Sequence, residues 1–149
     1  MKTFFALIAL AASLFAGPSV GQPFPPTTLE DQFGKTHTVG AEGLILISFE
    51  RDVSDRVNAF LKQQPKSFLT DNGTVYIADI SAMPTIIAKL FALPKMRDYP
   101  YAVLLNRDED FEKGFDKREG KLTVYRLQGG NVIAVEFIDT DELGKLFEK

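Results

Sequence analysis

Short apolar runs and segments of helical periodicity alternate along the chain. Residues 44–49 form a continuous apolar run, which is typical of a strand buried on both faces. In residues 53–64 the apolar positions recur at helical spacing and polar side chains fill the other face, so the pattern predicts an amphipathic helix. Asp52 or Ser54 would cap the start of this helix, and Pro65 would end it.

The same alternation of strand and helix occurs a second time. After the turn signal at Asn72-Gly73, residues 74–80 predict a second buried strand. Residues 81–93 then predict a helix that carries Pro84 in its first turn and ends at Pro94. We expect its apolar stripe to face the core, and this stripe comprises Ile86, Ile87, Leu90 and Phe91.

A β-hairpin is predicted at each end of this unit. Residues 29–39 alternate around a turn at Gly34, and residues 122–127 and 132–138 flank a turn at Gly129-Gly130. These hairpins would add antiparallel strands to the parallel ones.

Three further elements complete the predicted order. Residues 101–105 read as a third buried strand, and the charged residues 106–120 as a loop with one helical turn. Asp139 and Glu142 have the spacing of a capping box, which would open a terminal helix. The whole pattern predicts one α/β domain with a central mixed β-sheet flanked by helices and an N-terminal β-hairpin.

Residues 1–21 are predicted to be a signal peptide. A positively charged start precedes an apolar run that ends at Ala16. Ser19-Val20-Gly21 then places small residues at positions −3 and −1, so we expect cleavage before Gln22, with a site nearer Ala16 as the alternative. The alternative of a retained anchor is less favoured because the run is too short to cross a bilayer comfortably.

Export would leave residues 22–149 as one domain in a periplasm or outside the cell. No later apolar stretch approaches the length of a membrane-spanning helix, so we expect no membrane insertion after cleavage. The oligomeric state is left open.

Composition excludes several classes of chemistry. The chain has no cysteine, which excludes disulfides, thiolate metal sites and thiol catalysis. Its formal net charge is −3, so we expect no nucleic-acid partner and no electrostatic attraction to anionic lipid. His37 is the only histidine, and we expect it to be a solvated hairpin residue and not a metal ligand.

Three segments resemble the thioredoxin fold with a peroxiredoxin-type start. Residues 28–35 (TLEDQFGK) are similar to the hairpin that opens many peroxiredoxins and secreted thiol–disulfide proteins, and residues 44–49 lead into a helix as the family's first core strand does. Tyr99-Pro100 before a strand resembles the family's cis-proline. The resemblance implies a thioredoxin-like fold with a redox centre at the junction of that strand and helix. At this junction Arg51 and Ser54 stand where thiols would be, so redox activity is not carried over.

A second resemblance is to a group of small secreted proteobacterial proteins of unknown function. It is carried by residues 79–84 (DISAMP) together with residues 96–98 (MRD). Some members of the group bear the label of flavin-containing dehydrogenase. This chain has no Gly-x-Gly-x-x-Gly turn after a strand, so we expect neither FAD nor FMN and no other cofactor.

The candidate site is a groove at the strand–helix junction. Its expected lining residues are Glu50, Arg51, Asp52, Ser54, Tyr99 and Pro100. In the thioredoxin fold a groove beside the cis-proline binds extended peptide, and a guanidinium there could grip a carboxylate. The alternative interpretation is that the acidic residues only favour the helix dipole and the arginine is solvated.

Three functions are therefore compared. The first is a binding module of the cell envelope that holds an extended peptide or a loop of an envelope protein. The second is an enzyme that uses Glu50, Arg51 and Asp52 as polar or acid–base groups, which would require a buried carboxylate. The third is a structural subunit that docks through a strand edge or an exposed apolar patch.

Overall fold

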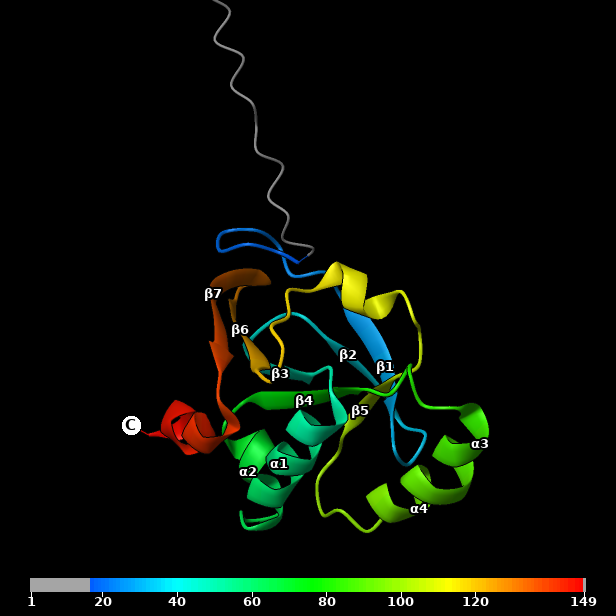
Figure 1. Ribbon diagram of the computed structural model, residues 1–149. Helices are drawn as coiled ribbons and strands as arrows, with labels where there is room; N and C mark the ends of the chain where they lie inside the picture. The colour runs from blue at the N-terminus through cyan, green and yellow to red at the C-terminus, as the bar shows by residue number, and fades with distance from the viewer. Residues whose placement is uncertain (1–16, 149) are drawn as a thin grey trace, which may run out of the picture.

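A seven-stranded mixed sheet organises the computed structural model, which describes residues 17–148 (Figure 1). Most of the predicted signal peptide, residues 1–16, lies outside the described part. The strands occur in the order β2-β1-β5-β4-β3-β6-β7. Their bounds are β1 Thr27–Asp31, β2 Thr36–Val39, β3 Gly43–Ser48, β4 Thr74–Asp79, β5 Leu104–Asn106, β6 Leu122–Gln128 and β7 Asn131–Ile138.

The central strands follow the apolar runs of the sequence. Strand β3 pairs in parallel with β4 on one side and antiparallel with β6 on the other, and five of its six residues are buried. Strand β4 in turn pairs in parallel with β5, and β1 pairs antiparallel with both β5 and β2. The predicted mixed sheet, both hairpins and the order of strands and helices are confirmed.

Helical elements cover the sheet and connect its strands. They are α1 Arg51–Lys62, α2 Phe68–Asp71, α3 Thr85–Ile87, the π-helix η1 Ala88–Ala92, α4 Leu93–Met96 and the 3-10 helices η2 Phe111–Gly114 and η3 Thr140–Phe147. Alternate residues of β3 enter different cores, so Leu46 packs on the α1 side and Ile47 on the opposite side. None of the described helices has the length and apolar character needed to cross a bilayer.

The second predicted helix differs from the expectation in shape and in orientation. It runs past Pro94 to Met96, and the π-helix η1 ends two residues before this proline. A proline inside a helix removes a backbone hydrogen bond and crowds the preceding turn, and a π-type widening accommodates it. The element buries Ala88 and Leu93, so the expectation that its large apolar stripe faces the core was wrong.

The predicted caps of two helices were also wrong. At α1 neither Asp52 nor Ser54 caps, because Glu50 is the N-cap residue and, within residues 17–148, no side chain caps it. At the C-terminus Asp139 precedes a 3-10 helix, and its Oδ1 accepts a hydrogen bond from Lys121 Nζ at 2.5 Å instead of closing a capping box. Strand β6 brings Lys121 close, and sequence spacing cannot show this long-range partner.

The side chain of Gln32 ties the N-terminal hairpin to the segment before β5. This amide is 1% exposed. Its Nε2 donates to the carbonyl oxygens of Tyr101 at 2.7 Å and Met96 at 3.2 Å, and its Oε1 accepts from the backbone N–H of Val103 at 2.8 Å. One side chain therefore satisfies three buried backbone groups that a regular strand pairing would otherwise satisfy.

We expect Gln32→Leu to lower the free energy of unfolding by about 2–5 kcal/mol, because it leaves these backbone groups buried without partners. Urea denaturation at neutral pH measures the change. The matched control is Gln128→Leu at an exposed position, which should remain within about 0.5 kcal/mol of wild type. Equal stability of the two variants would contradict this prediction.

Candidate functional site

The predicted site residues Glu50, Arg51 and Asp52 lie together at the junction of β3 and α1. Glu50 Oε2 accepts a hydrogen bond from the backbone N–H of Gly120 at 2.6 Å. With Glu119 the four residues line a cleft of about 330 Å³. The loop before β6 thus lies against the junction of β3 and α1, because β6 runs antiparallel to β3 and starts where β3 ends.

The charged groups of this cleft are open to solvent. The side chain of Arg51 is 89% exposed, and its Nε lies 3.9 Å from Asp55 Oδ2, which makes at most a weak surface ion pair. Glu50 and Asp52 are both exposed. An acid–base role requires a carboxylate in a closed, desolvated site, so the geometry gives no support to the enzyme alternative.

Ser54 does not line the groove. Its hydroxyl lies 2.8 Å from the hydroxyl of Tyr76, which is also 2.8 Å from the hydroxyl of Ser48. Burial raises the pKa of Tyr76 to about 12, so this phenol stays protonated and hydrogen-bonded at neutral pH. Ser54 therefore belongs to a buried polar network beneath α1.

Tyr99 and Pro100 lie at the other end of α1. Tyr99 packs beside Lys62, whose Nζ is 4.4 Å from the ring centroid, and the hydroxyl of Tyr101 donates to Asn58 Oδ1 at 2.8 Å. The 12 residues of α1 make a helix roughly 18 Å long between these contacts and Arg51. The predicted single groove around Arg51 and Pro100 is therefore wrong.

The sheet topology explains this separation. Residues 99–100 precede β5, which is parallel to β4 and β3, so they lie where the parallel strands begin. Helix α1 starts where β3 ends, so Arg51 lies at the opposite, carboxyl-terminal end of the parallel strands. The expected cis bond is also absent, since every peptide bond in residues 17–148 is trans.

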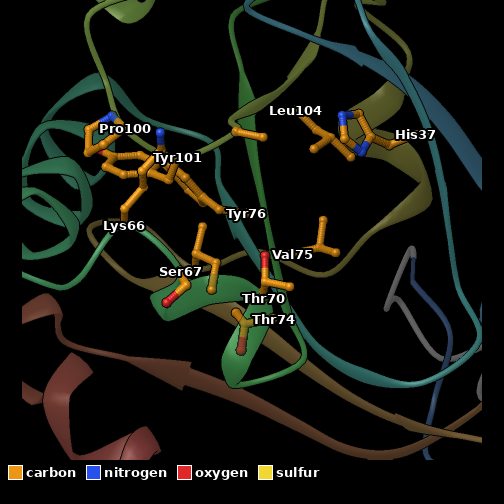
Figure 2. Close-up of a pocket in the computed structure, with 12 residues that line it drawn as sticks. His37, Lys66, Ser67, Thr70, Thr74, Val75, Tyr76, Pro100, Tyr101 and Leu104 are labelled. Carbon is orange, nitrogen blue, oxygen red and sulfur yellow. The ribbon is translucent and has the colours of Figure 1, made fainter.

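Pro100 instead lines a larger cavity of about 550 Å³, which we call the slot (Figure 2). Lys66 and Pro100 lie on one side of it, and His37 and Leu104 on the other. Its remaining lining residues are Ser67, Leu69, Thr70, Thr74, Val75, Tyr76, Tyr101 and Ala102.

The slot coincides with a gap in the sheet. Strand β4 pairs with β3 from Thr74 onward, but it pairs with β5 only from Ile77. Both hydrophobic cores contribute to the lining of the slot: Tyr76 belongs to the core on the α1 side of the sheet and Val75 to the core on the opposite side. The first half of β4 has a partner strand on one side only.

Backbone groups of β4 are directed toward this gap. The carbonyl of Gly73 accepts a hydrogen bond from Leu44 N in β3 at 3.0 Å. Neighbouring residues of a strand direct their backbone groups to opposite edges, so the N–H and C=O groups of Thr74 and Tyr76 face the β5 side. No β5 residue is paired with Thr74 or Tyr76 in the register of the described strands.

His37, which lines the slot, is hydrogen-bonded to the buried carboxylate of Asp31. His37 Nε2 lies 2.7 Å from Asp31 Oδ2, and the two side chains are 29% and 3% exposed. Asp31 Oδ1 also accepts from the backbone N–H groups of Phe33 at 2.8 Å and Lys35 at 3.0 Å. The prediction that His37 is a solvated residue was wrong, because the hairpin turn places a carboxylate against it.

Sequence reasoning missed most of the slot. Its polar groups come from the hairpin, from residues 66–70 and from β4, and none of these forms a recognisable motif. The one available signal was Pro100, since a proline at the start of an apolar run delays strand pairing. That run begins at Tyr101, yet β5 begins only at Leu104. Within residues 17–148 no cluster of three or more potential metal-ligating side chains occurs.

Comparisons with known proteins identify the fold. Neither the family models nor the curated protein sequences include a match. Solved structures do match, and a proposed protein disulfide isomerase from Bacteroides thetaiotaomicron superposes with a TM-score of 0.58 at 17% identity, covering 87% of this chain and 86% of that one.

Two further structures agree. The peroxidoxin BcpB from Mycobacterium tuberculosis gives a TM-score of 0.56 at 15% identity, covering 87% of this chain and 93% of that one. The thioredoxin domain of a thiol–disulfide oxidoreductase from Bacteroides vulgatus gives 0.55 at 13% identity, covering 87% and 99%. The chain thus has a thioredoxin-like fold, as predicted, and it has no cysteine.

The Asp31–His37 pair generates a prediction about acid stability. Burial raises the pKa of Asp31, but hydrogen bonds from His37 and from the backbone of Lys35 and Phe33 outweigh it and leave the pKa below its usual 3.8. A carboxyl with a lowered folded pKa contributes stability above 3.8, and this contribution is lost as pH falls through the folded value.

We therefore expect Asp31→Asn to be less stable than wild type at pH 7 and to show a flatter loss of stability below pH 3.8. Urea midpoints measured across this pH range test the expectation. Glu30→Gln, an exposed neighbour in the same strand, is the control. If Asp31→Asn retained the full acid sensitivity of wild type, the buried pair would not be its source.

Proposed function

We propose that this protein is an exported binding module of thioredoxin-like fold without redox chemistry, and that its ligand is an extended peptide segment held in the slot. The observation that carries the proposal is that the first half of β4 has no partner strand on its β5 side, where a cavity of about 550 Å³ lies. Extended peptides bind proteins by adding main-chain hydrogen bonds to a strand with a free edge.

The lining of the slot suggests which peptide it accepts. Thr74 supplies a backbone donor and a backbone acceptor and Tyr76 a backbone donor, which are indifferent to peptide sequence. The apolar walls include Leu69 and Tyr101, so an apolar side chain fits between them. Lys66 is exposed at the mouth of the slot and would favour a carboxylate on the same peptide.

Export and a partner in the cell envelope rest on the signal-peptide pattern of residues 1–21. The charged cleft at Glu50, Arg51 and Asp52 is the second candidate contact surface, because its groups are exposed. The alternative of a structural subunit has one observation in its favour, which is an exposed apolar patch on the element formed by α3, η1 and α4.

Selection from a displayed library of random peptides against the purified protein tests the proposal. We expect bound peptides to slow hydrogen exchange at the amides of Thr74 and Tyr76, as measured by NMR, because these N–H groups become main-chain donors. Ala102→Phe, which fills the slot, should weaken peptide binding by at least about tenfold.

The matched control is Ala59→Phe on the exposed face of α1, which should bind as wild type does. Circular dichroism confirms that both variants fold. If Ala102→Phe does not fold, Thr70→Trp at the exposed rim of the slot replaces it. Protection at Arg51 and Asp52 with none at Thr74, or a library without binders, would contradict the assignment to the slot.

A further inference from the structure

Four large apolar side chains form an exposed patch on the helical element between β4 and β5, which we call the outer patch. Ile86 is 68% exposed, Ile87 43%, Leu90 64% and Phe91 66%. The element is already held on the domain by Ala88, Leu93 and Met96, all of which are buried. It is therefore apolar on two faces, and the outer patch is not needed for the core.

The backbone geometry brings these side chains together. Ile86 and Leu90 are four residues apart, and so are Ile87 and Phe91. Side chains at this spacing lie on the same face of a helix, and the two pairs are neighbours because their members are consecutive residues. Figure 1 shows the element at one side of the molecule, apart from α1 and α2.

The charged residues of the element that carries the outer patch are all cationic, which the net charge of the whole chain does not predict. Residues 81–97 contain Lys89, Lys95 and Arg97 and no acidic residue, although the chain as a whole carries −3. All three cationic residues are exposed. Acidic residues of the flanking segments are Asp79, whose Oδ1 accepts a hydrogen bond from the backbone N–H of Ser81, Asp98, which follows directly, and Glu109, which lines a cavity together with Thr85. The basic character is thus local to the element that carries the outer patch.

We propose that the outer patch docks the protein onto the surface of an anionic phospholipid bilayer. Isoleucine, leucine and phenylalanine side chains backed by lysines are the composition of helices that lie in the membrane interface. Each lysine near an anionic surface strengthens binding, and the apolar side chains enter the boundary between headgroups and acyl chains.

A second copy of this chain fits the outer patch less well. Pairing two patches would bring Lys89 and Lys95 close to their own counterparts, and like charges oppose that contact. Four side chains also supply only part of the ~800 Å² per partner that a stable protein interface buries. The proposal does not rest on peptide binding in the slot, because none of the four residues lines it.

The absence of tryptophan from the chain makes a site-specific test possible. We expect the Phe91→Trp variant of the full chain to shift its fluorescence to shorter wavelength with vesicles of phosphatidylglycerol and phosphatidylcholine. Brominated acyl chains should quench this emission, because the indole enters the membrane boundary. The matched control is Ile133→Trp on β7, where the native side chain is 51% exposed, and it should show neither effect.

The charges are tested in the Phe91→Trp background. Adding Lys89→Gln and Lys95→Gln should weaken the vesicle affinity derived from the shift by about fivefold per lysine. The apolar run of residues 4–16 can itself partition into vesicles, so the readout is the tryptophan signal and not total binding.

Two outcomes would overturn the proposal. The first is the same fluorescence and quenching at position 91 as at position 133 in the presence of vesicles. The second is a dimer in sedimentation analysis that Leu90→Glu with Phe91→Glu converts to monomer, since the outer patch would then be covered by a second copy. Peptide binding by these variants is measured in parallel, so failure of membrane docking is distinguishable from failure of the slot.

Discussion

The buried amide of Gln32 determines how the parallel half of the sheet is completed. By bonding Tyr101 O and Val103 N, it acts as a partner strand for the segment before β5 and holds that segment beside the N-terminal hairpin. Pairing of β5 with β4 then begins only at Leu104. The first half of β4 is left without a partner on that side, where the slot lies, and the Gln32 amide satisfies backbone groups on the hairpin side that would be costly if buried and unpaired.

The two ends of the parallel strands have different chemistry. At the end where β3 leads into α1, Glu50, Arg51 and Asp52 are charged and exposed, and the carboxylate of Glu50 accepts a hydrogen bond from the backbone N–H of Gly120. At the other end the sheet is open, and the cavity there is larger and partly apolar. This cysteine-free scaffold thus has a larger cavity at the end of the parallel strands away from the strand–helix junction.

The slot and the outer patch would serve one protein in complementary ways. The slot suits a peptide recognised by its main chain, and the outer patch suits a flat anionic surface recognised by charge and apolar area. The element that carries the outer patch is also linked to the wall of the slot, since Gln32 bonds both Met96 O and Tyr101 O. Docking at the bilayer would hold the slot near envelope partners.

The sequence by itself determined the elements and the fold class. Continuous apolar runs located β3 and β4, period and turn residues located α1 and both hairpins, and the lack of cysteine excluded thiol chemistry. These features are local, so they can be read within a window of a dozen residues. Tertiary structure decided which segments meet. It separated Arg51 from Pro100, paired His37 with Asp31 and left Leu90 and Phe91 outside the core. The separation of Arg51 from Pro100 depends on strand order, which is fixed by contacts between residues far apart in the chain. The contact of His37 with Asp31 depends on the geometry of the hairpin turn, and neither is contained in local periodicity.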